Sequence, residues 1–439
     1  MESYKAFKCN HKGENVKITK LSLAAIAAMT ITTGAMAENT ANFSGNVKLW
    51  YETADTDGGV DNSLFHKNST NGFSSGDAAA SLEVKGKAGV LGYGVKYTAV
   101  DSLGLEGNLV SSRRATGTDA NGLNTAHWAE KAFITYKMGN TTAKIGRQHL
   151  NTPLAFTETW NVAANSFDAV VLMNNDIENV TLMGSYVGKH NGYSAPGSAA
   201  AGNGFLQPSA TFGTVTQNGK FETFGASGAY VAAALAKPVK DLGINAWYYN
   251  IKEVADAAWV DADYKIGPVM VGALYAQMMP NASGVDDTTA FAIKAGSKVG
   301  PVSLFAAYSD VSDDGVLLVG NVATGGKKTQ LPTAGVYNDG FIVAAPGAKS
   351  FKLKASYPVS SVNLTAQYMS TTNDNASGST PNGALGREVD EIDLIAATKI
   401  ADVNVKAIYV NRTFGTNGNN GIVLQSDSNH VRIIAGINF

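Results

Sequence analysis

A group of charged side chains between residues 131 and 168 has the types and the spacing that an ion filter needs. Lys131, Lys144 and Arg147 carry positive charge, and Glu158 and Asp168 follow them with negative charge. If the two signs face each other across a narrow, water-filled passage, the field between them orders water and sorts solutes by charge and dipole. A plainer role stays open for two of these residues. Arg147 could bond a carboxylate or loop carbonyls, and Glu158 could be a solvated loop charge.

Catalytic chemistry is not predicted for this chain. Barrel-shaped proteases and phospholipases need a Ser or Asp nucleophilic system with a positioned His. No histidine after residue 37 lies in a recognisable catalytic motif; these histidines are His66, His127, His149, His190 and His430. No His-x-Glu, Cys-x-x-Cys or phosphate-cradling glycine loop occurs either, so we predict no cofactor and no metal site, and only loosely held Ca²⁺ on loop carboxylates stays open.

The elements that must position the charged residues are β-strands. Segments of alternating apolar and polar residues recur along the chain, with turn signals between them. A strand turns successive side chains to opposite faces, so each segment has one apolar face. We predict about 18 strands, with roughly 16 as the alternative. They cover residues 41–53, 79–89, 93–103, 127–138, 141–148, 167–174, 178–189, 225–236, 242–252, 257–266, 269–279, 289–299, 302–311, 350–357, 362–371, 389–400, 403–412 and 429–439.

The connections between these segments alternate between long and short. The short ones are tight turns such as Gly267-Pro268, and only the short connection 253–256 breaks the rhythm. The long ones cover residues 54–78, 104–126, 149–166, 190–224, 280–288, 312–349, 372–388 and 413–428. Outer-membrane barrels have short periplasmic turns, long external loops and an even number of strands. The pattern therefore predicts an all-β, transmembrane antiparallel β-barrel, whereas a soluble β-sandwich gives no reason for such alternation.

The start of the chain has the order of an export signal. Lys17 and Lys20 precede the short apolar run 21–31, and a small-x-small sequence ends at Ala37, before Glu38. We predict a secretory signal peptide over residues 1–37, cleaved between Ala37 and Glu38. A membrane anchor is the alternative, but the apolar run is well short of the ~20 residues that a spanning helix needs.

Residues 1–15 are too long and too polar for the charged start of a signal peptide. We hypothesise that this start is mis-assigned and that Val16 is the true initiator. N-terminal sequencing of the unprocessed precursor tests this, and a precursor that begins at Met1 contradicts it. The single cysteine, Cys9, lies before the apolar run, so residues 38–439 contain no cysteine for a disulfide.

Residues 38–439 are predicted to form one barrel domain. The mean hydropathy is −0.05, and no run of about 18 apolar residues occurs, which excludes a bundle of membrane-spanning helices. Removing residues 1–37 removes five Lys and two Glu, so the formal charge changes from −2 to −5. This acidic balance argues against nucleic acid as a partner.

Basic side chains dominate the polar faces of the predicted strands. If the apolar face of each strand contacts lipid, the other face lines the lumen. The candidate pore-wall residues on that face are Lys85, Lys96, Lys352, Lys354 and Arg432. Because residues 38–439 are net acidic, their acidic side chains must lie mostly in the loops and at strand ends. A basic wall below an acidic mouth of this kind favours anions near the wall. The alternative is that polar side chains point inward only because lipid excludes them, with no selectivity.

A short motif in the third long connection carries a family resemblance. Gly146-Arg147-Gln148, Thr152-Pro153 and Asn165-x-Phe167-Asp168 bracket residues 149–166. Here the chain resembles the major outer-membrane porins of Campylobacter-type bacteria and, more distantly, the OprD-like porins. The resemblance implies a third loop folded into the pore and a homotrimer. The arginine ladder of the OprD-like porins is not evident, and scattered lysines lack the planar fork that grips carboxylate. A general pore is therefore favoured.

The last strand, 429–439, places Val431, Ile433, Ala435, Ile437 and Phe439 on one face, with Ile434 as an apolar exception on the other. It resembles the closing strand of outer-membrane barrels, whose terminal Phe is part of the signal read by the barrel-assembly machinery. We expect deletion of Phe439 to impair assembly. We expect Arg432→Ala to spare assembly and to alter conductance.

The sequence as a whole favours an outer-membrane porin, exported through the periplasm, through which ions and small hydrophilic solutes diffuse passively. Its expected surroundings are outer-membrane lipid and lipopolysaccharide. The small-residue stretch 225–236 could pack against a neighbouring subunit. The alternatives are an adhesin or structural surface barrel and, less favoured, a barrel hydrolase.

Overall fold

The computed structural model describes residues 39–56, 63–65, 73–101, 126–192, 215–216, 219–373, 387–416 and 427–439. The predicted signal peptide, with its cleavage site between Ala37 and Glu38 and the hypothetical start at Val16, lies outside the described residues. These features therefore stay predictions.

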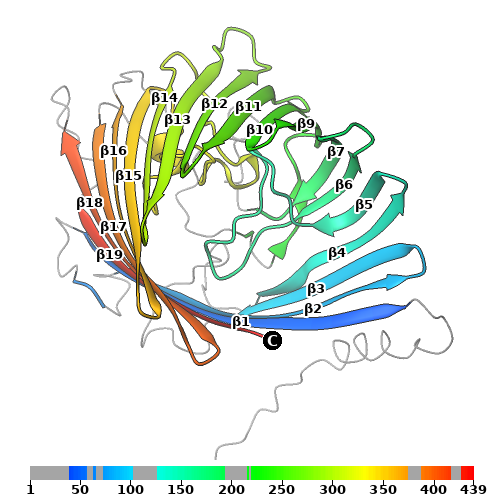
Figure 1. Ribbon diagram of the computed structural model, residues 1–439, viewed down its shortest axis with the longest axis horizontal. Helices are drawn as coiled ribbons and strands as arrows, with labels where there is room; N and C mark the ends of the chain where they lie inside the picture. The colour runs from blue at the N-terminus through cyan, green and yellow to red at the C-terminus, as the bar shows by residue number, and fades with distance from the viewer. Residues whose placement is uncertain are drawn as a thin grey trace, which may run out of the picture.

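Antiparallel strands wind around a central opening (Figure 1). The strands are β1 (Thr40–Thr56), β2 (Phe73–Ala88), β3 (Leu91–Asp101), β4 (Ala126–Met138), β5 (Thr141–Gln148), β6 (Phe167–Asn174), β7 (Val180–His190), β8 (Glu222–Thr223), β9 (Ala229–Val239), β10 (Leu242–Ile251), β11 (Ala255–Ile266), β12 (Val269–Pro280), β13 (Thr288–Val299), β14 (Val302–Val311), β15 (Ala348–Val359), β16 (Val362–Asn373), β17 (Arg387–Ile400), β18 (Val403–Thr416) and β19 (Ser428–Asn438). Two short helices, η4 (Val322–Thr324) and α2 (Gly340–Val343), lie between β14 and β15.

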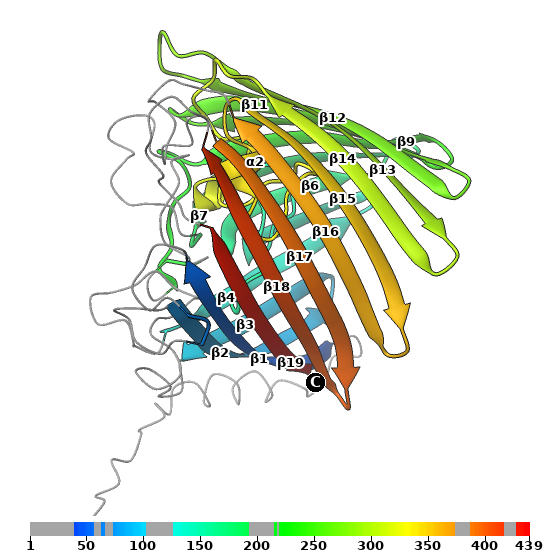
Figure 2. The same ribbon diagram turned by 90° about the vertical axis from the view of Figure 1, so that its left-hand side faces the viewer.

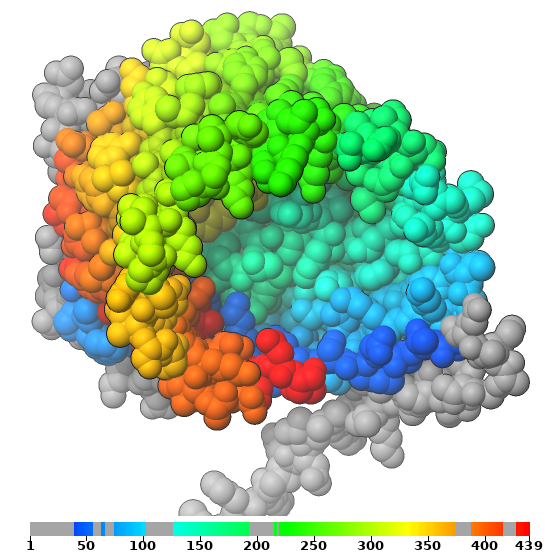
Figure 3. Space-filling view, in the orientation of Figure 1, coloured from blue at the N-terminus to red at the C-terminus, as the bar shows by residue number. Residues whose placement is uncertain are grey.

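The sheet is closed, because β1 pairs antiparallel with both β2 and β19. The short β8 pairs only with the end of β7, and β7 continues the ring by pairing with β9. Of the 19 strands in the sheet, eighteen therefore form the barrel, which confirms the predicted fold class. The strands are steeply tilted (Figure 2), and a hollow opens in the middle of the ring (Figure 3).

The alternation of side chains gives the wall an apolar outside and a polar inside. In β15, Phe351, Leu353 and Tyr357 are 41%, 54% and 46% exposed on the outer surface. Lys352, on the opposite face, is 8% exposed. Lipid-facing and lumen-facing residues alternate in this way in transmembrane barrels. Among the described residues, no helix is long and apolar enough to cross a membrane.

Two-residue turns join most of the strand pairs at one end of the barrel; the connection between β6 and β7, residues 175–179, is longer. In most of these turns the first residue takes a left-handed conformation, as at Gly267 (φ 58°) and Gly300 (φ 58°). Such turns match the right-handed twist of a hairpin. Ala401 holds the same place with a φ of 52°, although its Cβ disfavours that conformation. This end has the short connections that are periplasmic in outer-membrane barrels.

The last residue closes the seam between the first and the last strand. The Gly45 N–H donates to the Phe439 carbonyl at 2.6 Å, and the Phe439 N–H donates to the Gly45 carbonyl at 3.0 Å. A Cβ at position 45 would lie 2.3 Å from the Phe439 ring, so the aromatic ring occupies the space that glycine leaves. The role of Phe439 as an assembly signal stays a prediction.

One side of the barrel interior is filled by an apolar core. Loop 149–166 and loop 312–347 pack together against the inner faces of β6, β7 and β9 to β14. Buried members of this core include Leu154, Phe167, Tyr249, Met278 and Val319. The third long connection therefore folds inward, as predicted. Loop 312–347 does so as well, which was not predicted.

Candidate pore constriction

Loop 149–166 spans the lumen from one wall to the other. The Leu154 N–H donates to the Tyr249 hydroxyl on β10 at 3.3 Å. Lys48 on β1 donates from its Nζ to the Thr159 carbonyl at 3.4 Å and to the Asn161 carbonyl. The loop therefore contacts both walls, and the open part of the lumen is left along the β1 side.

Glu158 joins the two inward loops and does not face water. Its carboxylate accepts hydrogen bonds from Trp160 Nε1 at 2.7 Å, Asn321 Nδ2 at 2.9 Å and the Thr324 hydroxyl. The residue is 2% exposed. The structure thus contradicts both sequence interpretations of Glu158, as a pore charge and as a solvated loop charge. The carboxylate is enclosed because loop 312–347, which was not expected in the lumen, covers it.

The second inward loop is held by a carboxylate on β17. Glu391 accepts backbone N–H donors from Val336 at 2.7 Å, Tyr337 at 3.0 Å and Asn338 at 2.6 Å. Lys352 on β15 donates to the Ala334 carbonyl at 2.5 Å. The predicted pore-wall residue Lys352 is therefore buried against this loop.

Arg432 lies in a buried cage and is not a pore-lining residue. Its Nε is 2.7 Å from a carboxylate oxygen of Glu52, which is fully buried. The guanidinium lies over the rings of Trp50 at 4.6 Å, Tyr337 at 5.1 Å and Trp160 at 5.7 Å. Arg432 is only 5% exposed, so the predicted pore-wall position is corrected to a structural one.

Arg147 and Asp168 pair with each other across β5 and β6. Arg147 Nε and Nη2 lie 2.8 and 3.1 Å from the two Asp168 oxygens. Arg147 Nη1 donates to the Ala129 carbonyl at 3.1 Å, and the guanidinium stacks 3.3 Å from the Phe221 ring. This matches the plainer sequence interpretation of Arg147, a bond to a carboxylate and a loop or strand carbonyl. The two residues do not form opposite sides of a constriction.

The lysines on β2 to β4 form a chain of ion pairs. Lys85 and Lys131 lie 3.0 and 3.1 Å from the same Glu83 oxygen. Lys96 lies 2.7 Å from Glu130. These three lysines share two carboxylates, so the group leaves a net charge of +1 in the lumen.

His149, at the start of the third loop, lies 2.9 Å from Glu130. Burial lowers the pKa of His149 below its ordinary value, although the Glu130 carboxylate opposes this. Burial thus disfavours a positive charge on this ring.

Two further predicted lysines contact aromatic rings. Lys144 Nζ lies 4.0 Å from the Phe133 ring, and Lys354 Nζ lies 5.5 Å from the Phe305 ring. Within the described part of the chain, neither has an ion pair with a carboxylate. Both positive charges therefore contribute to the potential of the lumen.

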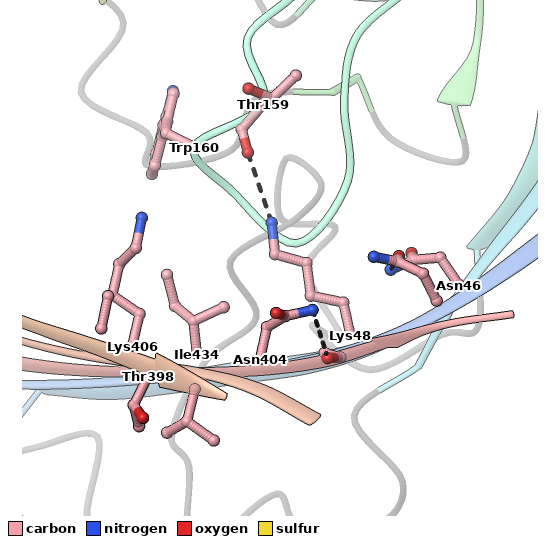
Figure 4. A pocket seen from close by; sticks show the side chains of 12 residues that line it. Asn46, Lys48, Thr159, Trp160, Thr398, Asn404, Lys406 and Ile434 are labelled. Carbon is pink, nitrogen blue, oxygen red and sulfur yellow. Dashed lines mark hydrogen bonds between the residues drawn. The ribbon is translucent and has the colours of Figure 1, made fainter. Parts of the chain in front are cut away.

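The narrow zone itself lies between the tip of loop 149–166 and the wall of β1, β18 and β19. A pocket of about 560 Å³ opens there. Lys48 and Lys406 extend from the wall toward Thr159 and Trp160 at the loop tip, whereas Thr398 points to the other side of the wall (Figure 4). Lys406 has no carboxylate partner among the residues that the structure describes.

Lys48 and Trp160 were missed as site residues. For Lys48 the signal was present, because it alternates with Val47 and Leu49 in the first predicted strand and must face the lumen. Trp160 had no such signal, because a loop has no periodicity that would fix the direction of a side chain. Within the described ranges, no group of three or more His, Cys, Asp or Glu side chains could hold a metal ion.

Comparisons with known proteins agree with a barrel that forms a pore. A family model described as "Gram-negative porin" matches residues 22–340. No curated protein matches the sequence.

Solved structures share the fold at low identity. OccK8 (OprE) of Pseudomonas aeruginosa is 15% identical, with a TM-score of 0.65 over 91% of this chain and 98% of that chain. OccAB4 of Acinetobacter baumannii is 12% identical, with a TM-score of 0.67 over 92% of this chain and 99% of that chain. OccAB1 of the same species is 16% identical, with a TM-score of 0.66 over 91% and 96%.

Proposed function

Because this chain belongs to the Gram-negative porin family, we propose that its outer-membrane channel conducts small anions in preference to cations. The channel is a passive one for ions and small hydrophilic solutes. Its selectivity is set where the loop tip at Thr159 and Trp160 approaches Lys48 and Lys406 on the wall.

The observation that carries this proposal is the uncompensated positive charge in the open part of the lumen. Lys48 donates to backbone carbonyls, Lys144 lies over an aromatic ring, and Lys406 has no carboxylate partner among the described residues. By contrast, Glu83, Glu130 and Asp263 are each paired with a lysine. A net positive lining at a constriction raises the local concentration of anions and lowers that of cations.

Planar-bilayer recording tests this proposal. We expect discrete conductance steps and, in a KCl gradient, a reversal potential displaced toward the chloride equilibrium potential. Lys406→Gln should reduce that displacement. The control Lys399→Gln removes a lysine that is 59% exposed and lies 3.4 Å from Asp402 at a turn, so it should leave the displacement nearly unchanged. A cation preference in the parent protein contradicts the proposal.

Several further properties rest on the family and on the sequence alone. We propose export with a signal peptide over residues 1–37, insertion by the barrel-assembly machinery through Phe439, and a homotrimer surrounded by lipopolysaccharide. The more specific resemblance to the Campylobacter-type porins belongs here as well. The absence of enzymatic activity is a proposal supported by the family, whose members are channels.

The outer surface offers one place for subunit contact. Small residues on β9, including Ala232, lie beside Gly184 on β7 and line an apolar hollow with Tyr186 and Tyr230. This hollow overlaps the small-residue stretch 225–236. Native electrophoresis after mild extraction tests the trimer, and a monomer would contradict it.

A further inference from the structure

Within the described part of the chain, no carboxylate forms an ion pair with the positive charge at the constriction pocket. Lys48 and Lys406 both line it, and they come from β1 and β18 on either side of β19. Lys48 Nζ is held in place by the Thr159 and Asn161 carbonyls, which offset no full charge. The site therefore presents two ammonium groups, one of them in a fixed position, to whatever passes the loop tip (Figure 4).

The positive charge of the pocket is carried by lysines, and this favours some classes of anion over others. Arginine offers a planar fork that fits carboxylate, whereas lysine acts as a compact point charge. Two arginines on the strands that also supply pocket residues, β19 and β18, are already paired. Arg432 on β19 is paired with Glu52 and is 5% exposed. Arg412 lies 3.6 Å from Glu391 with its side chain 12% exposed. A single carboxylate would neutralise only one of the two lysines, whereas a phosphate monoester carries a charge of about −1.5 to −2 at pH 7.

The rest of the lining suits a hydroxylated body beside the anion. Amide side chains supply donors and acceptors at the bottom of the pocket; they belong to Asn46, Asn404 and Asn438. Asn46 Nδ2 donates to Asn438 Oδ1 at 3.2 Å, which leaves the Asn438 amide hydrogens and the Asn46 carbonyl oxygen available for a solute.

An aromatic wall faces these amides. The Trp160 ring is fixed by the bond from its Nε1 to Glu158 and by an edge contact with Trp50 at 5.9 Å. Lys328 Nζ and the Arg432 guanidinium lie over this ring at 5.2 and 5.7 Å, and the part of the ring that lines the pocket can contact the apolar C–H groups of a sugar. The pocket volume of about 560 Å³ is in the range of sites for small ligands.

From these observations we propose that this pocket is a binding subsite for a phosphorylated, hydroxylated solute such as a sugar phosphate, held at the constriction during passage. Lys48 and Lys406 bind the phosphate, the amides bind hydroxyl groups, and Trp160 covers the sugar ring. This inference rests on the proposed channel function and names the solute class that the same constriction favours.

Blocking of the KCl current in a planar bilayer tests the subsite. Glucose 6-phosphate, inorganic phosphate, gluconate and glucose are added separately to the mature full-length protein at pH 7.5. Gluconate is hydroxylated but carries a single carboxylate, so glucose 6-phosphate should block at a concentration about tenfold below that of gluconate, and glucose should block weakly. Lys48→Gln and Lys406→Gln should each raise the half-blocking concentration of glucose 6-phosphate about tenfold, since a charge-assisted bond contributes about that factor. The matched control Lys298→Gln removes one exposed lysine from β13 and should leave that concentration unchanged.

Trp160→Ala distinguishes the contribution of the sugar ring to binding from that of the phosphate. It should weaken the block by glucose 6-phosphate several-fold and leave the block by inorganic phosphate unchanged. If gluconate blocks as well as glucose 6-phosphate, or if Lys406→Gln changes nothing, the proposed subsite is wrong, although the channel function is unaffected. If the parent protein gives no conductance steps, the proposed function fails first, so the two failures are distinguishable.

Discussion

Replacing Arg432 with methionine should destabilise the barrel strongly. The substitution keeps an unbranched side chain but removes the guanidinium group and its charge, so the buried Glu52 carboxylate, which is 0% exposed, loses the arginine at 2.7 Å. Removing one partner of a buried ion pair costs ~3–5 kcal/mol. Loss of the contact with the Trp50 ring at 4.6 Å adds about 1 kcal/mol. The Tyr337 hydroxyl still donates to Glu52 and offsets part of this cost. We therefore expect a loss of about 3–4 kcal/mol in the free energy of unfolding.

A double-mutant cycle shows whether the ion pair is the cause. Glu52→Gln with Arg432→Met removes both charges, so it should recover about 2 kcal/mol relative to Arg432→Met alone. Lys399→Met is the control for loss of a lumen-side cation. Its pair with Asp402 is exposed, and such pairs contribute about 0–1 kcal/mol.

Equilibrium urea unfolding in lipid vesicles, followed by tryptophan fluorescence, measures these differences. Trp50 and Trp160 lie against Arg432 and report on the cage. The reasoning is refuted if Arg432→Met unfolds within about 1 kcal/mol of the parent protein, or if the double variant is no more stable than the single one. The sequence had suggested that the loss of Arg432 would spare assembly, and the structure reverses that expectation.

Three further changes test other parts of the structure. Glu158→Gln should loosen the two inward loops. The amide nitrogen that replaces one carboxylate oxygen cannot accept, so either the bond from Trp160 or the bonds from Asn321 and Thr324 are lost; single-channel current noise should rise, and an unchanged trace would contradict this. Ala401→Gly should stabilise the barrel by about 0.5–1 kcal/mol, because glycine adopts a φ of 52° without strain; urea unfolding measures it, and a loss of stability is the adverse result. Glu391→Gln should free loop 312–347 from the wall, because two or more backbone N–H groups lose a charged acceptor. Limited proteolysis should then cut within 333–339, and equal protection of this segment in both proteins would contradict the role of Glu391 in holding the loop.

The strands and their faces were predictable because alternation is a local property. Each predicted strand overlaps a strand of the barrel, and the outward face of 429–439 is as expected. The one apolar exception, Ile434, has a physical reason. It faces inward and packs against the apolar cluster around Trp50 and Trp160.

Side-chain partners were not predictable, because they depend on which distant strands and loops meet. Arg432 and Glu52 are 380 positions apart and become neighbours only when β19 pairs with β1. The alternation of side chains along the strand correctly predicted that Arg432 points inward. It could not show that loop 312–347 covers that part of the lumen with Tyr337.

The inward course of loop 312–347 did leave a signal in the sequence. Residues 316–319 and 341–345 are apolar, which is unusual for a connection exposed to water. Most of these residues are buried inside the barrel; Leu318, Val319 and Val343 are examples. Apolar clusters in long loops of a predicted barrel therefore indicate segments that fold into the lumen.

The most direct test of the central claim is the reversal potential of the channel in a KCl gradient, before and after removal of Lys48 and Lys406. The parent protein should prefer chloride, and the double variant Lys48→Gln/Lys406→Gln should lose most of that preference while its conductance steps persist. A parent channel that prefers potassium, or a double variant with an unchanged reversal potential, would contradict the assignment of selectivity to this constriction.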